Sequence, residues 1–326
     1  MNLRKQITGI FSCIGILILI IDGETALTGA AAGINLCIKT VIPSLFPFLF
    51  LCSLLTCSLW GIDTRWLKRV GKKLGIPQGA ESILIAAVLG GYPAGAQIIG
   101  TAFQNGNIEK DDACHLLTFC SNAGPAFLLG MASAMFPDHT IVWALWQIQI
   151  LAAAMTGISG QYIPKNPAVL SSTDLTISDH LLRTIRVMAS ICGWVLLFRI
   201  LIAFLDKWIL FYFPDEFKVL INGILELSNG CVLLNLLDSI PLRFIMCSAF
   251  LSFGGLCVTM QTISVIGSLS IVSYLSGKLR QVCFSVFLCI LYLQLGWISF
   301  LICVIILWFL PVRIKNKSGF PTLQGV

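Results

Sequence analysis

The stretch LGGYPAGAQIIG, residues Leu89–Gly100, interrupts an apolar segment with residue types that a membrane helix usually avoids. It contains a Gly-Gly pair, a proline, a tyrosine and a glutamine. Glycine permits unusual backbone dihedrals, and proline both fixes φ and removes a hydrogen-bond donor. Backbone groups that escape helical pairing at membrane depth must face protein or a watery cavity. The stretch therefore predicts a turn between two short half-helices.

The composition of the whole chain is that of an integral membrane protein. Of its 326 residues, 57% are hydrophobic and only 11% are charged, and the mean hydropathy is +0.92, far outside the range of soluble globular domains. Apolar runs that match or approach the roughly 20 residues of a helical crossing lie at 11–21, 41–60, 141–158, 191–205 and 283–310. The last run leaves open a short hairpin or one long tilted crossing. The alternating strands of a membrane barrel are absent from the sequence, so we predict an all-α, polytopic fold.

Charge and cysteine usage exclude several function classes. The net charge of +6 comes mostly from basic residues in particular short loops, which is the pattern that orients membrane helices and does not indicate nucleic-acid binding. The 13 cysteines lie mostly within apolar runs and include no C-x-x-C pair. We interpret them as small packing residues, and we predict no metal ion and no cofactor.

The loop charges also predict a topology, because Lys and Arg are retained on the cytoplasmic side. The segments predicted to be cytoplasmic are 4–5, 65–73, 110, 165–186, 278–280 and 313–317. The segments predicted to be external are 22–24, 136–140 and 206–216. A cleaved signal peptide is the alternative for the N-terminus, but we prefer a retained first helix because the chain that follows stays in the membrane.

On this topology, residues 81–104 enter and leave on the same side, so we predict a re-entrant hairpin. Freed amides at the start of a half-helix carry partial positive charge and can hold an anionic group. The alternative for Gly91 and Gly95 is close helix packing in a small-xxx-small pattern. We favour a site here, because packing alone does not offset the cost of the polar residues. For Gly29 and Gly33, which have the same spacing, we favour packing.

Three further interruptions extend this pattern to the rest of the chain. They are FCSNAGPAF (Phe119–Phe127), GILELSNG (Gly223–Gly230) and SFGGLCVTMQ (Ser252–Gln261). Each half of the chain thus offers an apolar helix, a hairpin-like segment and a second broken helix, and such matching interruptions point to a site between repeats. The second hairpin, 217–240, is expected to enter from the external side, so the halves are expected to be inverted. The predicted units are an N-terminal membrane repeat with its leading helix (1–164), a polar linker (165–182), a C-terminal membrane repeat (183–312) and a cytoplasmic tail (313–326).

An ordered series of short motifs carries a family resemblance along nearly all of the chain. The motifs are VIPSLFPF (Val41–Phe48), GGYPAGAQ (Gly90–Gln97), FCSNAGP (Phe119–Pro125), ELSNG (Glu226–Gly230) and FGGLCVTMQ (Phe253–Gln261). The series resembles the YlbJ family of sporulation integral membrane proteins, within the nucleoside-recognition or Gate group. The resemblance implies two inverted repeats with re-entrant hairpins, as in concentrative nucleoside carriers. It also implies movement of dipicolinate, a small aromatic dicarboxylate, across the outer forespore membrane, although Thr259 stands where the family commonly has a histidine.

The candidate binding residues are the polar and helix-breaking residues of the interruptions. We predict no basic residue in the apolar spans apart from Lys39 and Arg199, so attraction for carboxylates is expected from half-helix N-termini and side-chain donors. Tyr92 could stack on an aromatic ring. The predicted substrate-binding residues are Tyr92, Pro93, Gly95, Gln97, Ser121, Asn122, Gly124, Pro125, Glu226, Ser228, Asn229, Gly254, Gly255, Thr259 and Gln261.

Ionisable residues in apolar spans are costly, and they are functional candidates by default. Glu226 is the strongest candidate and could couple transport to protons; its alternative role is a protonated carboxyl group satisfied by neighbouring backbone. We interpret Arg199 as structural, with Asp206 as a candidate partner, and we expect Lys39 to reach an interface.

An enzyme is not predicted. GISG (Gly157–Gly160) matches a short signature of intramembrane serine proteases, but a serine nucleophile needs a base within hydrogen-bond reach. The histidines, His115, His139 and His180, lie near a boundary or in loops, so we interpret GISG as a packing motif. The sequence has no H-E-x-x-H, ATP-binding or Rossmann signature.

The sequence thus predicts a multi-pass protein of the bacterial cell membrane that moves a small anionic solute. The expected partners are that solute and the lipid bilayer, without nucleic acid, and a homo-oligomer is left open. The alternatives are a nucleoside-like metabolite carrier, a non-transporting assembly factor for the spore envelope and, remotely, an intramembrane hydrolase.

Overall fold

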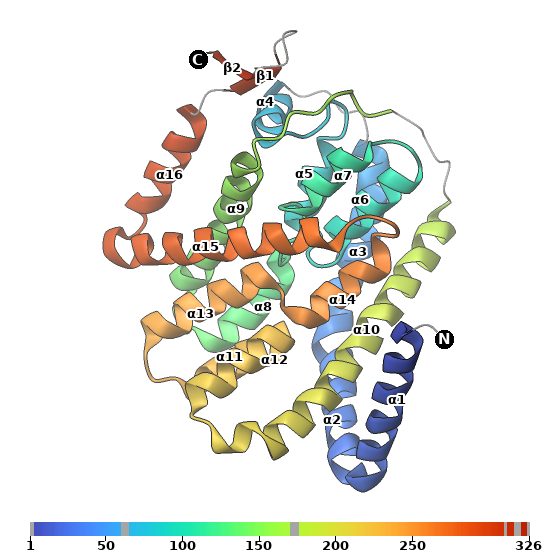
Figure 1. Cartoon of the computed structure of the whole chain (residues 1–326). Helices are drawn as coiled ribbons and strands as arrows, with labels where there is room; N and C mark the ends of the chain where they lie inside the picture. The colour runs from blue at the N-terminus through green and yellow to red at the C-terminus, as the bar shows by residue number, and fades with distance from the viewer. Residues whose placement is uncertain (1–2, 60–64, 170–175, 310–311, 316–320, 325–326) are drawn as a thin grey trace.

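A computed structural model describes residues 3–59, 65–169, 176–309, 312–315 and 321–324, and shows a helical protein with one short β-hairpin (Figure 1). The helices of the first half are α1 (Leu3–Ile21), α2 (Gly23–Leu36), the π-helix η1 (Cys37–Val41), α3 (Ile42–Leu59), α4 (Arg65–Leu74), α5 (Ser82–Leu89), α6 (Ala94–Gln104), α7 (Lys110–Leu117), α8 (Pro125–Met135) and α9 (His139–Ser159). Those of the second half are α10 (Ile177–Trp208), the 3₁₀-helix η2 (Leu210–Tyr212), α11 (Asp215–Leu225), α12 (Leu227–Leu233), the 3₁₀-helix η3 (Leu234–Leu236), α13 (Ile240–Phe253), α14 (Gly255–Val265), α15 (Ile271–Leu295) and α16 (Ile298–Phe309). Strand β1 (Val312–Lys315) pairs antiparallel with β2 (Pro321–Gln324). The helical prediction is confirmed.

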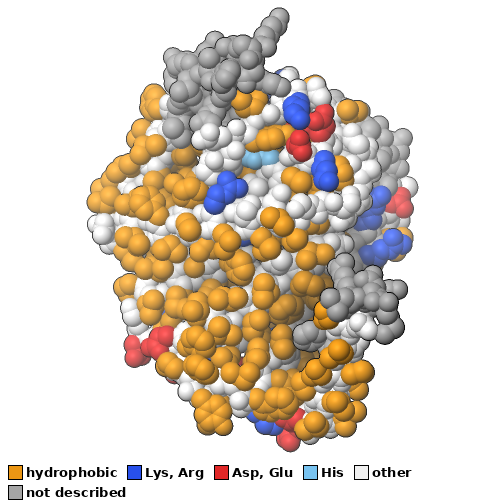
Figure 2. All heavy atoms as spheres, viewed as in Figure 1, with side chains coloured by type: hydrophobic (Ala, Val, Ile, Leu, Met, Phe, Trp, Pro, Cys, Tyr) orange, Lys and Arg blue, Asp and Glu red, His pale blue; other side chains and the backbone are white. Residues whose placement is uncertain are grey.

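Five helical segments of the described chain are long and apolar enough to cross a bilayer. They are Gly23–Leu55, His139–Ser159, Ile177–Trp208, Ile240–Val265 and Ile271–Leu295. In Figure 2, apolar side chains cover the broad middle of the face, while most charged side chains lie toward its upper part, its right edge and its lower tip. An apolar surface of this extent would aggregate in water and is stable in lipid. The fold is therefore that of a membrane protein.

The cores lie where helices from different parts of the chain meet. The largest cluster joins α8, α9, α12, α13 and α15 through buried residues that include Leu128, Leu145, Leu227, Phe250 and Leu288. A second cluster joins α5, α6 and α7 through buried residues that include Ile83, Ile99 and Leu116. Because α9 packs against α13 and α15, and α10 packs against α2 and α3, elements of the two predicted halves are in direct contact.

Close packing of α2 against α10 explains the first small-xxx-small pair. A Cβ atom added to Gly29 would lie 2.9 Å from the Cβ of Ala203, and one added to Gly33 would lie 3.1 Å from Cδ1 of Leu196. Both distances are shorter than comfortable van der Waals contacts. The packing interpretation of Gly29 and Gly33 is confirmed.

Two boundaries differ from those expected from the sequence. Helix α10 begins at Ile177, because the Thr176 hydroxyl and the Asp179 carboxylate form a reciprocal capping box, so residues 177–182 of the predicted linker are helical. The run 283–310 is neither one continuous crossing nor a symmetrical hairpin. Helix α15 ends at Leu295, Gly296 takes a φ of +57°, and α16 leaves at a steep angle (Figure 1).

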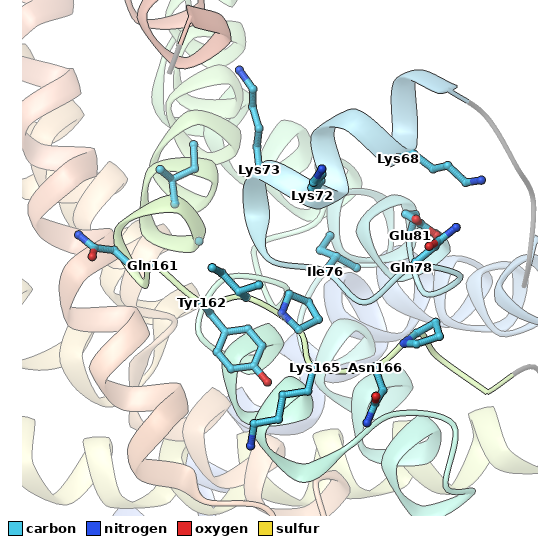
Figure 3. Close-up of a pocket in the computed structure, with 15 residues that line it drawn as sticks. Lys68, Lys72, Lys73, Ile76, Gln78, Glu81, Gln161, Tyr162, Lys165 and Asn166 are labelled. Carbon is cyan, nitrogen blue, oxygen red and sulfur yellow. The ribbon is translucent and has the colours of Figure 1, made fainter. Parts of the chain in front are cut away.

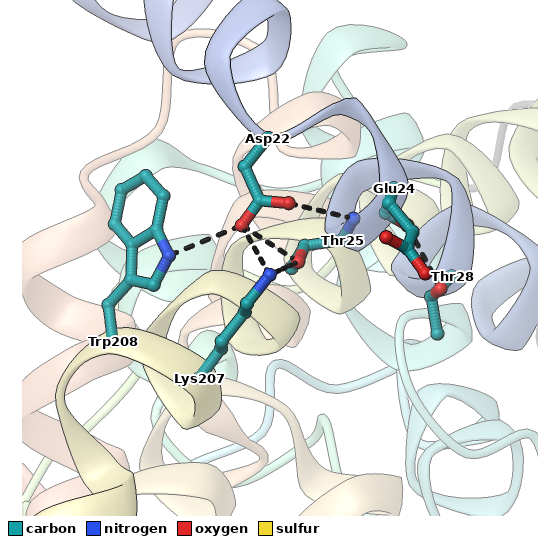
Figure 4. A network of polar contacts seen from close by, with 6 residues as sticks. All are labelled: Asp22, Glu24, Thr25, Thr28, Lys207 and Trp208. Carbon is teal, nitrogen blue, oxygen red and sulfur yellow. Dashed lines mark hydrogen bonds and ion pairs between the residues drawn. The ribbon is translucent and has the colours of Figure 1, made fainter.

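The α1–α2 turn and the end of α10 are joined by a polar network (Figure 4). Asp22 caps α2 by accepting from the Thr25 amide at 3.3 Å, and it also accepts from Lys207 Nζ at 2.7 Å and Trp208 Nε1 at 3.3 Å. The hydrogen bond from Lys207 lowers the pKa of Asp22 to about 2. The structure thus brings together two segments predicted to share the external side. In Figure 1 they lie at the end opposite α4 and the β-hairpin.

Candidate functional site

Each predicted interruption is a break between two helices. Residues 90–93 separate α5 from α6, and residues 118–124 separate α7 from α8. Glu226 separates α11 from α12, and Gly254 separates α13 from α14. Gly91 has a φ of +71°, and Gly254 has a φ of +81°, values in the left-handed region that glycine adopts without steric cost. Each break is thus followed directly by the N-terminus of a new helix.

The four breaks meet in the interior of the protein. The glycines of the breaks show this, because each lies against a different break. A Cβ atom added to Gly91 would lie 2.8 Å from the Gly124 nitrogen. A Cβ atom added to Gly254 would lie 3.2 Å from Tyr92 Cζ, and one added to Gly255 would lie 3.2 Å from the Leu227 nitrogen. The N-terminal ends of α6, α8, α12 and α14 are therefore gathered in one place. Helix N-termini carry partial positive charge.

A small cavity of about 40 Å³ lies at this junction. The predicted site residues that line it are Tyr92, Gly124, Glu226, Ser228 and Gln261. Apolar residues of η1, α3, α8, α10, α12 and α14 complete the wall. A liquid water molecule occupies about 30 Å³, so the cavity is of the size of one or two waters.

A lysine that the sequence analysis assigned to a cytoplasmic loop lies beside this cavity. Lys278 belongs to α15, and its side chain is fully buried. Its Nζ donates to Gln281 Oε1 at 2.8 Å, to the Tyr92 hydroxyl at 3.2 Å, to Asn122 Oδ1 at 3.2 Å and to the Ser121 carbonyl. Among the described residues, no carboxylate forms an ion pair with it.

The oxygens around Lys278 are held in place by further hydrogen bonds. The Gln281 amide donates to Asn122 Oδ1 at 2.8 Å, the Asn122 amide donates to the Phe119 carbonyl at 2.7 Å, and the Tyr92 hydroxyl donates to the Leu251 carbonyl at 3.1 Å. The ammonium also lies 4.9 Å from the centre of the Tyr92 ring, within the range of a cation–π interaction. The cation is thus surrounded by neutral groups.

One buried hydroxyl group at this site has no hydrogen-bond partner within the described part of the chain. It is the hydroxyl of Ser121. The Tyr274 ring centre lies 5.7 Å from Lys278 Nζ. Buried polar groups are nearly always hydrogen-bonded, so this region retains capacity for a polar ligand.

The placement of Lys278 corrects two sequence-based predictions. It is not a loop residue, and Lys39 and Arg199 are not the only basic residues in the apolar spans, because α15 is a 25-residue candidate span. The available signal was periodicity. Tyr274, Lys278, Gln281 and Ser285 are all buried and recur at helical spacing, which defines one inward polar stripe.

Glu226 is satisfied by local backbone, as the alternative interpretation proposed. Its two carboxylate oxygens accept from the Ser228 amide at 3.0 Å and the Asn229 amide at 2.7 Å, so it caps α12. Asn229 also accepts from Arg199 and donates to Asn222 at 2.8 Å. The suggested Arg199–Asp206 pair is therefore wrong, since Asp206 instead accepts from Asn222 at 3.1 Å.

The remaining candidates do not all reach the cavity. Gly95 packs so closely against the Cys120 carbonyl that an added Cβ would overlap it. Close packing, which was the alternative interpretation of this glycine, is therefore part of its role. Gln97 is half-buried on α6 and lies outside the cavity lining. The Thr259 hydroxyl donates to the Gly255 carbonyl at 3.0 Å.

Pro93 and Pro125 stand at the starts of α6 and α8, where a missing amide donor costs little. Lys39 is exposed on η1, in keeping with an interfacial position.

The GISG segment ends α9. Ser159 donates to the Thr156 carbonyl at 2.8 Å and accepts from Arg280 at 3.3 Å, while His115 Nε2 lies 2.7 Å from the Leu74 carbonyl. The described cysteines are all free thiols. In the described ranges, no group of three or more His, Cys, Asp or Glu side chains is placed to hold a metal ion.

No protein-family model, curated protein or solved structure matches the chain. Functional inference therefore rests on the junction of the helix breaks and on Lys278.

Proposed function

We propose that this protein moves a small anionic solute across a bacterial cell membrane, through a site at the junction of the four helix breaks. The observation that carries the proposal is Lys278, a buried basic side chain surrounded by neutral oxygens. A buried charge without an opposite charge is costly. A carboxylate of the solute would supply that charge, and the N-termini of α6, α8 and α14 would add to the attraction.

Tyr92 connects the lysine with the cavity. It lines the cavity, and its hydroxyl accepts a hydrogen bond from Lys278. In the proposed mechanism, rotation of Tyr92 opens the cavity toward Lys278, and the aromatic face then stacks on a planar solute.

The cavity of about 40 Å³ is too small for a metabolite, so the proposed transport cycle requires the helices to separate. The arrangement of the breaks supports a cycle based on two inverted repeats with re-entrant hairpins. The paired helices α5 and α6 have 8 and 11 residues, and the paired helices α11 and α12 have 11 and 7. None reaches the roughly 20 residues of a crossing. Each pair is followed by a second interrupted segment, α7–α8 and α13–α14 respectively, in the same order in both halves.

Glu226 gives the proposed site a second ionisable group, since it lines the cavity from the opposite break. We assign it proton coupling, so that anion and proton move together. No enzymatic step is part of the proposal.

The resemblance to the YlbJ family makes dipicolinate the first solute to test, with the outer forespore membrane as the location. Dipicolinate combines two carboxylates for Lys278 and the helix N-termini with a planar ring for Tyr92. A neutral nucleoside would make no use of the lysine charge, so the same observation disfavours the nucleoside-like carrier.

The direct test is reconstitution of the full chain into liposomes that contain labelled dipicolinate or labelled uridine. We expect release of dipicolinate above that from protein-free liposomes, and little release of uridine. Faster release of uridine would assign the protein to nucleoside-like carriers. Release of neither solute by folded protein would overturn the transport proposal and favour an assembly factor.

Variants locate the site within the same assay. Asn122→Ala removes an oxygen that accepts from both Lys278 and Gln281, and we expect it to reduce dipicolinate release at least tenfold, which corresponds to about 1.4 kcal/mol. Gly95→Leu is not a suitable test, because its side chain would overlap the Cys120 carbonyl and disturb packing.

A further inference from the structure

A second cavity, of about 520 Å³, opens at the end of the molecule that carries α4 (Figure 3). One wall is α4, which contributes Lys68, Lys72 and Lys73, and the opposite wall is residues 161–167, which follow α9. Figure 3 shows the Tyr162 side chain directed away from α4. Segments far apart in the chain thus form one basic pocket, separate from the junction of the helix breaks.

Helix α4 has the pattern of a helix that lies in a membrane interface. Its sequence, RWLKRVGKKL, contains five basic residues and no acidic residue. Leu67, Gly71 and Leu74 form the buried face, while Trp66 is 62% exposed. Because its apolar face packs against the protein, α4 can present its basic residues and the exposed Trp66 to an anionic bilayer surface.

A hydrogen bond joins α4 to α16. Lys73 Nζ donates to the Leu307 carbonyl of α16 at 3.1 Å. The apolar side chains of α16, including Leu301, Val304 and Ile305, are exposed on the outside of the protein. The basic rim of the pocket therefore adjoins the end of a lipid-facing helix, where phospholipid headgroups lie.

The pocket keeps an excess of positive charge. Its lining carries four lysines and one carboxylate, that of Glu81, which accepts from the Gly79 amide at 2.8 Å. Lys165 is paired with Asp111 at 3.3 Å, and the lysines of the lining still outnumber its one carboxylate.

The histidine beneath the pocket adds no charge near neutral pH. Tyr162 stacks on His115 with ring centres 4.6 Å apart and donates to Asp112 at 2.6 Å. Burial lowers the pKa of His115.

We propose that this pocket binds the phosphate of an anionic phospholipid, with the acyl chains directed along α16. The α4 lysines neutralise the phosphate, and Trp66 anchors the helix at the interface. The continuity of the basic rim with α16 favours a lipid over a free soluble anion, because only a lipid uses both surfaces.

The test uses the full chain in a neutral detergent, titrated with phosphatidylglycerol or with phosphatidylcholine. The readouts are the thermal unfolding midpoint and the lipid retained in native mass spectrometry. We expect phosphatidylglycerol to raise the midpoint and phosphatidylcholine to have little effect. In Lys68→Gln and Lys72→Gln we expect the apparent affinity for phosphatidylglycerol to fall about fivefold each, equivalent to about 1 kcal/mol per lysine.

Two variants serve as controls. Lys110→Gln changes an exposed lysine of α7 that lies outside the pocket, and it should keep the full response. Lys72→Arg preserves the charge, so phosphatidylglycerol should also raise its thermal unfolding midpoint. Equal responses to the two lipids, or equal losses in Lys72→Gln and Lys110→Gln, would overturn the proposal. Protection by soluble glycerol phosphate at the same concentrations would assign the pocket to a free anion and overturn the lipid assignment.

Discussion

The breaks of the first half and the α11–α12 break of the second half each enclose a buried ionisable side chain, and they hold it differently. Near Tyr92 and Asn122 this side chain is Lys278, supplied by the distant helix α15. At the α11–α12 break it is Glu226 itself, and the amides of Ser228 and Asn229 satisfy its carboxyl oxygens.

The two side chains therefore differ in whether local structure accounts for them. A carboxylate that caps the next helix stabilises its own break, so Glu226 has a sufficient local reason to be present. Lys278 has no such reason, because a buried ammonium among neutral acceptors costs free energy that an apolar residue would avoid. We therefore expect substitution of Lys278 to affect solute movement most. We expect substitution of Glu226 at the α11–α12 break to affect stability as well.

The largest effect is expected from Lys278→Met, which keeps the length and apolar stem of the side chain but removes the charge. Dipicolinate release should fall to the protein-free background in the liposome assay, whereas the thermal unfolding midpoint should stay close to that of the wild type. Lys278→Arg serves as the charge-preserving comparison and should retain part of the activity. Wild-type release by Lys278→Met would remove the functional distinction between the two breaks.

The next prediction concerns the close approach of α15 to the α7–α8 break, which places Lys278 beside Asn122. Gly277 faces Thr118, and an added Cβ would overlap the backbone there. Gly277→Ala should therefore destabilise the protein by about 3 kcal/mol, the upper end for overpacking, because backbone yields less than a side chain. The matched control is Gly193→Ala on α10, where a Cβ meets nothing within 4 Å. Equal thermal midpoints for both variants would show that the approach of α15 is not limited by this glycine.

Glu226→Gln examines the second break. A glutamine offers one acceptor oxygen to the two amides and turns a donor toward the other, so we expect a loss of about 2 kcal/mol in thermal unfolding. The exposed Glu24→Gln at the start of α2 is the control and should change stability little. In liposomes, Glu226→Gln should also abolish the dependence of release on a pH gradient. Unchanged stability would contradict the capping role.

The smallest effect is expected for the ion pair between Lys207 and Asp22. The pKa of Asp22 is lowered from 3.8 to about 2, so the ionised pair stabilises the fold above pH of about 4 and this contribution is lost as the pH falls through about 2. We expect the stability difference between wild type and Asp22→Asn to be constant above pH of about 4 and to vanish near pH of about 2. Because the pair is solvent-accessible, salt should reduce the difference. A difference that persists at pH of about 2 would mean that another contact is responsible.

Features that depend on local chemistry could be predicted from the residues alone. Hydropathy predicted the helical membrane fold, because a backbone in lipid must satisfy its hydrogen bonds internally. Gly91 and Pro93 predicted a break, because their dihedral limits are properties of the residues themselves. The cap on α12 joins Glu226 to the amides of Ser228 and Asn229, which follow it closely in the chain. Satisfaction of Glu226 by neighbouring backbone was therefore one of the alternatives that the sequence allowed.

Which distant segments share an environment depends on how the helices pack in three dimensions. Lys278 and Arg280 are two residues apart and equally basic, but Lys278 is fully buried and Arg280 is only half-buried. The difference arises because one face of α15 meets the residues around Asn122 and the other does not. The basic pocket likewise requires α4 and residues 161–167 to meet. Burial of a charged side chain depends on what lies opposite it in space, and no local preference of the chain encodes that.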